Sequence, residues 1–177
     1  GTWAITLTYI KALYSDRTVP YFRLLCDEKD IQAILFAALV HVIGHGAFTH
    51  YLEEMKGLFS GCDHEDYLIA VLKGDEEFTG DTESIKKDHQ ALFDCTKVWL
   101  GGKANYVKRK EFLRQVAEIF EKNREKMVLD ANLTQKESTK EIRTFLLNSI
   151  ISGPIDSDKT DYVRRDSHHC GVSYGYG

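Results

Sequence analysis

Apolar side chains recur at intervals of three and four residues through most of this 177-residue chain, which contains only two prolines. That spacing gathers apolar side chains on one face of an α-helix, whereas proline is the residue that most strongly interrupts a helix. The apolar positions of one such segment are Ile31, Ile34, Leu35, Ala38, Leu39 and Val42. The pattern predicts an all-α fold.

Further helices are predicted from the same spacing and from residues that typically cap helices. They are expected over 3–13, 31–42, from about 49 to 55, 64–71, 90–100, 108–128 and 141–151. Asp30 is expected to cap the second of these and Asp63 the fourth. Residues 73–88 are acidic and contain glycine, which predicts an exposed loop with His89 in solvent beside it.

Composition limits the class of protein. A chain that is 43% hydrophobic can bury a sizeable core, and its length suits one domain. The net charge of −4 and a pI near 6.0 argue against a dedicated nucleic-acid or anionic-membrane surface, although a local basic cluster could still bind one phosphate. No apolar run reaches the length that spans a membrane. Four cysteines without CxxC spacing predict reduced thiols in a cytoplasmic protein.

A cluster of three histidines, His41, His45 and His50, follows the predicted helix over 31–42. Imidazole is a common metal ligand and a proton carrier near neutral pH. The helix is expected to end near Gly44, because glycine suits the left-handed conformation of a helix cap. His41 would then lie on the last turn. The histidines alone fit either a functional site or packing and capping roles.

A second polar cluster lies at residues 155–169 and is expected to be helical. Pro154 is well placed to open that helix, and Asp156 or Ser157 could serve at its first turn. In a helix, one broad face would carry Asp158, Tyr162, Arg165 and Asp166.

That face could form a polar pocket, in which Asp158 would ligate a cation and Lys159 would pair with a phosphate. The alternative is an exposed helix stabilised by Asp–Lys and Asp–Arg pairs at helical spacing. Two such clusters in one small domain, rich in histidine and in carboxylate, together supply the nitrogen and oxygen ligands typical of a catalytic metal.

The segments LVHVIGHGAFTH (39–50) and SGPIDSDKTDYVRRDSHHCGVSYG (152–175) resemble the HD-domain phosphohydrolases. The similarity is to the branch of deoxynucleoside triphosphate triphosphohydrolases, which reads approximately LxHDxGHGPFSH and then IDxDxxDYxxRDxxxxG. It covers most of the chain and is densest over 31–65 and 151–175. The resemblance implies an all-helical HD core that hydrolyses a nucleotide phosphate with a divalent metal ion.

Carried over residue by residue, the resemblance implies that His41 and Asp158 are metal ligands. The metal would be iron, manganese, zinc, nickel or magnesium. Lys159 would bind the substrate phosphate, and Tyr162 and Asp166 would approach the sugar.

The resemblance also implies four catalytic residues. His45 and His50 would face the phosphates beside the scissile bond, and His64 matches a further active-site histidine of the branch. Glu53 lies three residues after His50, so it could orient that imidazole and raise its basicity for proton donation to the leaving oxygen.

The chain also departs from the pattern of the branch. The aspartate that gives the HD family half of its name is replaced by Val42, whose isopropyl group cannot coordinate a metal and is expected to continue the apolar face of its helix. Gly1 and Thr2 resemble the residues that follow the family's first histidine, so that ligand is expected just upstream. We therefore expect residues 1–177 to form a single HD domain that is shortened at its N-terminal end and lacks the family's C-terminal segments.

Two functions from different classes follow from these observations. The first is a metal-dependent phosphohydrolase acting on a nucleotide such as a dNTP. The alternative is a catalytically degraded HD domain that binds a nucleotide or a protein partner, which Val42 favours. Val42 could also be a local peculiarity of an otherwise active enzyme. The resemblance further implies self-association into a homo-oligomer.

Overall fold

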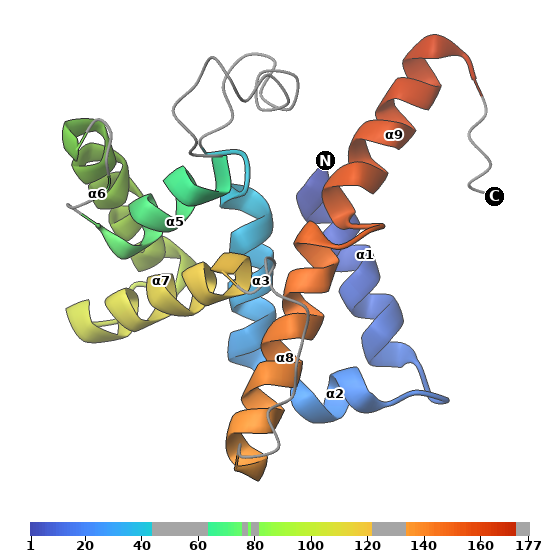
Figure 1. The fold of residues 1–177 in the computed structure, drawn as a ribbon, viewed down its shortest axis with the longest axis horizontal. Helices are drawn as coiled ribbons and strands as arrows, with labels where there is room; N and C mark the ends of the chain where they lie inside the picture. The colour runs from blue at the N-terminus through green and yellow to red at the C-terminus, as the bar shows by residue number, and fades with distance from the viewer. Residues whose placement is uncertain (44–63, 76–77, 79–81, 122–133, 173–177) are drawn as a thin grey trace. The chain divides into compact units, whose positions relative to one another are not determined.

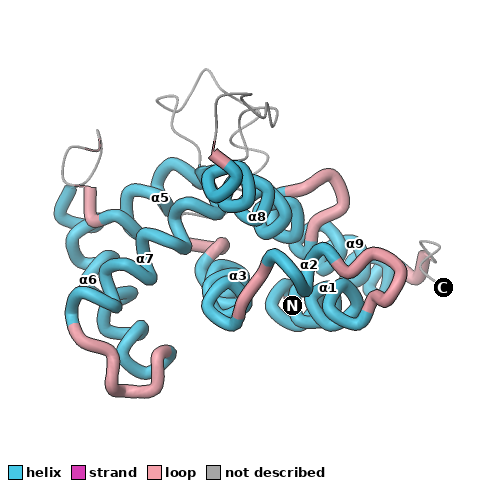
Figure 2. Tube along the Cα trace, turned by 90° about the horizontal axis from the view of Figure 1, so that it is seen from below, coloured by secondary structure: helices cyan, strands magenta, loops and turns pink. Residues whose placement is uncertain are grey.

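The structure is a computed structural model that describes residues 1–43, 64–75, 78, 82–121 and 134–172. Throughout these ranges the regular elements are α-helices, which confirms the predicted all-α class (Figures 1 and 2). The chain divides into two compact units, one formed by residues 1–39 and 122–177 and the other by residues 40–121. None of the described helices combines the length and the apolar character needed to cross a bilayer.

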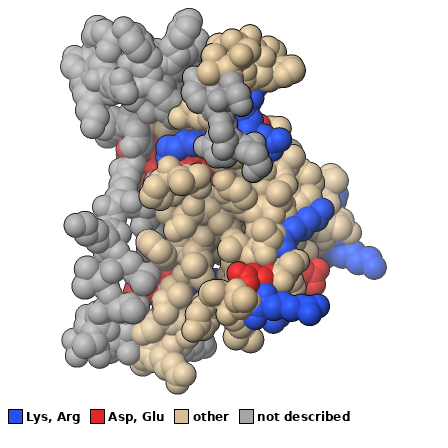
Figure 3. All heavy atoms as spheres, turned by 90° about the vertical axis from the view of Figure 1, so that its right-hand side faces the viewer, with Lys and Arg blue, Asp and Glu red and all other residues tan. Residues whose placement is uncertain are grey.

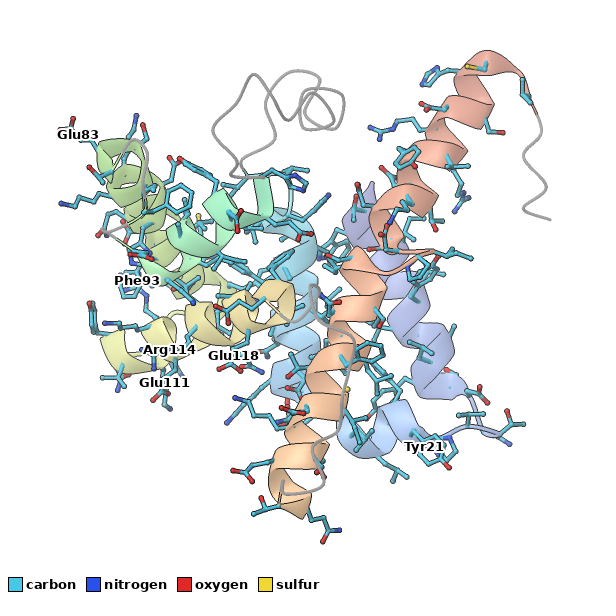
Figure 4. All side chains as sticks on the ribbon, in the orientation of Figure 1. Tyr21, Glu83, Phe93, Glu111, Arg114 and Glu118 are labelled. Atoms are coloured by element: carbon cyan, nitrogen blue, oxygen red, sulfur yellow. The ribbon has the colours of Figure 1, made fainter. Side chains whose placement is uncertain are left out.

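The first unit is built around a long N-terminal helix and two C-terminal helices. Its helices are α1 (Thr2–Ser15), α2 (Tyr21–Leu25), α3 (Glu28–Val40, whose last residue falls in the second unit), α8 (Gln135–Ser152) and α9 (Ser157–Cys170). Helix α1 packs against α9, α2 and α8, so the first and last helices of the chain lie side by side (Figure 1). The exposed ring of Tyr21 marks the start of α2 (Figure 4).

The predicted helix over 3–13 is confirmed, but its buried face is unexpectedly polar. Thr2, Thr6 and Ile10 are buried, whereas Trp3 and Leu13 are among the exposed large hydrophobic residues. Threonines at positions i and i+4 have the same spacing as an apolar stripe, and here they form the side of α1 that faces α9.

Helix α3 begins at Glu28, three residues before the predicted start, so Asp30 is not its cap. The cap is Asp27, whose carboxylate accepts from the backbone N–H groups of Lys29 (2.8 Å) and Asp30 (3.1 Å). In return, the Asp30 carboxylate accepts a hydrogen bond from the Asp27 N–H at 2.9 Å. It also forms an ion pair of 3.3 Å with Arg143 of α8. This reciprocal arrangement satisfies amide groups that the first helical turn leaves unpaired.

Burial is the main cause of two raised pKa values near this cap, those of Asp30 and Cys26. Asp30 is only 3% exposed, and desolvation raises the pKa of its carboxyl although the Arg143 guanidinium acts in the opposite direction. The adjacent Cys26 thiol is buried as well, and burial together with the charge of Asp30 raises its pKa to about 12.

Helix α8 has well-defined ends. It begins with a capping box in which Thr134 accepts from the Glu137 N–H while the Glu137 carboxylate accepts from the Thr134 N–H at 2.9 Å. It begins six residues before the predicted start at Glu141 and ends at Ser152, one residue beyond the predicted end, and Gly153 follows. A Cβ atom at residue 153 would lie 2.3 Å from the Ser149 carbonyl oxygen, so only glycine fits at this corner.

The second unit contains α5 (His64–Lys73), α6 (Thr82–Trp99) and α7 (Tyr106–Glu121), each of which packs against the other two. Leu68 and Val71 of α5 and Val116 of α7 are fully buried, and Phe120 is 2% exposed. The predicted helices over 64–71 and 108–128 are thus confirmed for their described residues. Asp63 and residues 122–128, on which part of those predictions depended, lie outside them.

The predicted loop over 73–88 is wrong at its C-terminal end, because α6 already begins at Thr82. Ile85 and Leu92 are seven residues apart and both buried, so residues 82–88 are the first part of an amphipathic helix. Its many charged residues make the apolar spacing hard to recognise in the sequence. His89 is therefore not a solvent-exposed loop residue. Its Nδ1 lies 2.7 Å from the Val71 carbonyl oxygen, and its ring packs where a side chain at Gly74 (φ +66°) would lie.

An aromatic cluster joins α6 to α7. At its centre is Phe93 of α6 (Figure 4). The Phe93 ring packs against His89 and Tyr106, with centroid distances of 6.1 and 5.0 Å, and the Arg109 guanidinium lies 3.9 Å above it. The guanidinium also donates to the Phe93 carbonyl and to Thr96 Oγ1. These contacts hold the two helices together.

We predict that Gly153→Ala destabilises the protein by about 1–3 kcal/mol, the usual cost of forcing additional atoms into a packed site. The added methyl group must displace backbone at the end of α8, because the atoms that it would meet are backbone atoms of Ser149 and not the end of a flexible side chain. Chemical denaturation followed by circular dichroism measures the change. Ser149→Ala, which removes a hydroxyl bonded within the same helix, is the control and should have little effect. Equal stability of Gly153→Ala and wild type would contradict the packing argument.

Thiol labelling provides a second test of the core. With a maleimide at pH 8, Cys95 and Cys170 should react in the folded protein because both are exposed, whereas Cys26 should be labelled only after unfolding. The thiolate is the reactive form, and a pKa near 12 leaves almost none at that pH. Peptide mapping by mass spectrometry resolves the individual cysteines. Rapid labelling of Cys26 under native conditions would show that this part of the core is open.

Candidate functional site

The α8–α9 corner is organised by one carboxylate, that of Asp156, which is 3% exposed. Its Oδ1 caps α9 by accepting from the Lys159 backbone N–H at 2.7 Å, and its Oδ2 accepts from the Lys159 ammonium, also at 2.7 Å. The same ammonium donates to the Gly153 carbonyl oxygen at 2.8 Å. The predicted helix is thus confirmed, but it begins at Ser157 rather than at Pro154, and Asp156 is its cap.

Three side-chain hydrogen bonds join α1 to the first turn of α9. Thr6 Oγ1 donates to Ser157 Oγ at 2.8 Å, and both side chains are fully buried. The Tyr9 hydroxyl and Thr160 Oγ1 are 2.7 Å apart. The third bond runs from Thr2 Oγ1 to Asp158 Oδ1 at 3.1 Å. We refer to these three bonds as the hydroxyl ladder.

The hydroxyl ladder holds Asp158, the predicted metal ligand, at the boundary between the buried interior and solvent. Ser157 and Thr160 on either side are buried, while Asp158 is partly exposed and Lys159 is exposed. The first turn of α9 thus presents a carboxylate and an ammonium next to one another, both attached to a rigid backbone. Such a turn could bind a cation and an anion together.

The outer part of α9 is largely exposed. Tyr162 is 39% exposed, and Asp166, the other residue expected at a sugar, is exposed as well. Arg165 forms an ion pair of 3.4 Å with Asp161, four residues earlier. This pair and the Asp156–Lys159 pair have the helical spacing that the alternative interpretation of this helix expects.

His41, the other predicted metal ligand, belongs to the second unit and lies beyond the end of α3, which stops at Val40. It is buried, with 9% exposure, in a turn closed by the Ile43 N–H and the Val40 carbonyl at 2.8 Å. The expectation that the helix continues to Gly44 is therefore wrong by several residues. So is the expectation that Val42 continues its apolar face, because Val42 lies in the turn and is 52% exposed.

His64 is the first residue of α5 and is partly buried, followed by Glu65 and Asp66 in the first turn. The remaining predicted catalytic residues, His45, His50 and Glu53, lie outside the described residues. Within the described ranges, no group of three or more His, Cys, Asp or Glu side chains is arranged to hold a metal ion.

Acidic and basic side chains are interspersed on the face shown in Figure 3, without a single field of one sign. That pattern agrees with the mixed charge of the sequence and its net charge of −4.

Sequence reasoning identified the polar side of α9 but missed its partners Thr2, Thr6 and Tyr9. Their spacing of four and three residues was the available signal, because it places all three hydroxyls on one face of α1. The apolar positions of the same helix have an equally regular spacing, so the pattern does not indicate which face is buried.

Two known proteins are similar to this chain. The uncharacterized protein YwfO of Bacillus subtilis (strain 168) is 31% identical over 151 residues, which is 85% of this chain and 24% of YwfO. The uncharacterized protein MJ1154 of Methanocaldococcus jannaschii is 39% identical over 59 residues, 33% of this chain and 13% of that protein. The chain thus spans about a quarter of the length of YwfO and less of MJ1154. No family model matches the chain, and no solved structure matches it.

The hydroxyl ladder can be tested by a double-mutant cycle on its buried bond. Thr6→Val removes the donor and leaves the Ser157 hydroxyl without its partner, so we predict a loss of about 1–3 kcal/mol in unfolding free energy. Ser157→Ala should cost a comparable amount. The double variant should lose less than the sum of the two, with a coupling of about 1 kcal/mol, measured by urea denaturation. Strict additivity would mean that the bond contributes nothing of its own.

Proposed function

We propose that the chain belongs to a metal-dependent phosphohydrolase acting on a nucleotide such as a dNTP, in the cytoplasm. The observation that carries the proposal is the first turn of α9, where the metal-ligand candidate Asp158 and the phosphate-binding candidate Lys159 are adjacent. Asp158 accepts a hydrogen bond from α1, and Lys159 is exposed. The resemblance of residues 39–50 and 152–175 to the HD-domain phosphohydrolases supports this class of reaction.

The chemistry of the donor groups fits a divalent metal. His41 would supply an imidazole nitrogen and Asp158 a carboxylate oxygen, the mixed ligand set typical of iron, manganese, zinc or nickel. Val42 supplies no donor atom, so affinity should be lower than in a site with an aspartate at that position. When bound, such a metal lowers the pKa of a coordinated water and polarises a phosphoryl oxygen.

The residues of the chain would carry out the remaining tasks. Lys159 and His45 would stabilise the charge that develops on the phosphate. His50, oriented by Glu53, would donate a proton to the leaving oxygen as the bond between it and phosphorus breaks. A water oxygen replaces that leaving group on phosphorus, so no covalent intermediate with the protein is needed.

The substrate would be recognised by groups around this centre. Tyr162 and Asp166 lie on α9 one and two turns beyond Asp158, where the exposed ring and carboxylate could contact a sugar hydroxyl. His64 would add a further imidazole beside the phosphates. Assembly into a homo-oligomer is part of the same proposal and depends on the resemblance alone.

A second function is favoured by one observation, the exposed valine next to the buried His41. In this alternative the domain has lost metal-dependent catalysis and binds a nucleotide or a protein partner. Lys159 and Tyr162 would still contact a phosphorylated ligand without hydrolysing it.

The two functions are separated by restoring the missing carboxylate in the full natural protein. We expect Val42→Asp to raise metal content, measured by elemental analysis, from substoichiometric to near-stoichiometric. The same change should raise the release of phosphate or triphosphate from a panel of dNTPs. The turn should accept the new side chain because residue 42 is half exposed.

Val42→Asn is the matched control, because the asparagine amide has nearly the shape of the aspartate carboxylate but lacks the negative charge that attracts a cation. It should change neither metal content nor hydrolysis. If Val42→Asp neither binds metal nor hydrolyses a dNTP, the phosphohydrolase proposal fails. Calorimetric titration of dNTPs into the metal-free protein would then test the binding alternative.

A further inference from the structure

Two carboxylates occupy the first turn of α9, and they have different partners. Asp156 is buried and caps the helix through the Lys159 N–H, so it satisfies the local backbone. The side chain of Asp158 contacts a different helix. Its Oδ1 accepts from Thr2 Oγ1, a hydroxyl 156 positions away in the sequence and on another helix.

We propose that Thr2 is a positioning residue, whose hydroxyl holds the Asp158 carboxylate in the orientation in which it binds a divalent metal ion. This inference rests on the proposed function, in which Asp158 is a metal ligand. It adds a residue of α1 that the sequence motifs do not single out.

The hydroxyl ladder explains how Thr2 can hold that orientation. The Thr6–Ser157 bond is fully buried, so water does not compete for it, and the Tyr9–Thr160 contact adds a second fixed point. With α1 fixed to the first turn of α9 at these two points, the Thr2 hydroxyl lies at a defined position beside Asp158. Thr2 is itself 7% exposed, so its side chain has little freedom to turn away.

The chemistry of a threonine–carboxylate pair suits this role. A hydroxyl has a single proton to donate, and directing it to Oδ1 fixes the rotation of the carboxyl group about its bond to the chain. Hydrogen bonds to the outer side of a ligating group typically change metal affinity by about 10- to 100-fold when they are removed. An ordered ligand also loses less conformational freedom when the metal binds.

The test compares three variants at two threonines of α1. Thr2→Val removes the hydroxyl and keeps the shape, whereas Thr2→Ser keeps the hydroxyl. Thr8→Val is the matched control, because the Thr8 hydroxyl is exposed and bonds to the Ala4 carbonyl within its own helix. All three are made in the full natural protein carrying Val42→Asp, which serves as the parent.

The readout is Mn²⁺ affinity, measured by titration of the metal-free protein and followed by electron paramagnetic resonance. We expect Thr2→Val to weaken Mn²⁺ binding by about 10- to 100-fold, and Thr2→Ser and Thr8→Val to stay within about threefold of the parent. Near-ultraviolet circular dichroism of each metal-free variant checks that the fold is retained. If Thr2→Val does not fold, Thr2→Ala takes its place, and Mn²⁺ affinity of Thr2→Ala within about threefold of the parent overturns the proposal.

Failure of the inference differs from failure of the proposed function. If the parent binds Mn²⁺ and Thr2→Val binds it equally well, Thr2 has no positioning role and only this inference is overturned. If the parent binds no Mn²⁺, the assignment of Asp158 as a ligand is wrong, and the inference falls with it.

Discussion

The buried hydrogen bond between Thr6 and Ser157 is the contact on which the rest of the candidate site depends. Helices usually pack through apolar side chains, which tolerate small sliding and rotation because dispersion forces are not directional. A hydroxyl pair without access to water tolerates neither, since each displacement leaves a buried polar group unsatisfied. The polar contact therefore sets the position of α1 against α9, and with it the surroundings of Asp158 and Lys159.

The division of work between Asp156 and Asp158 has a consequence for phosphate binding by Lys159. The ammonium already donates to the Asp156 carboxylate and to the Gly153 carbonyl, so one of its three protons remains for a ligand. The neighbouring carboxylate also offsets part of its positive charge. A phosphate at this turn would consequently need further positive charge nearby, which is the contribution that a bound metal makes in the proposed function. The two candidate roles on this turn depend on each other.

The sequence predicted those features that arise from contacts within a few residues. The helical class, the end of α8 before Pro154 and the Asp156 cap of α9 were all predictable, because each depends on backbone groups in the same segment. Features that depend on distant residues were missed. His89 was predicted to be an exposed loop residue because its contact with the Val71 carbonyl comes from another helix. The charged residues between Ile85 and Leu92 hid the helical spacing of these two buried side chains. The candidate site shows the same limit, since the polar side of α9 could be predicted but its hydroxyl partners on α1 could not.

Val42 shows why packing and function must be separated at this site. A buried valine is normally retained because removing it leaves a cavity, but a side chain that is 52% exposed has little packing to lose. An aspartate could occupy the same turn with little effect on the core. Folding therefore does not account for the valine, whereas the adjacent His41 is buried and held by the fold. Replacing valine by aspartate at residue 42 should therefore change mainly the affinity for a cation. That affinity is the property in which the two proposed functions differ.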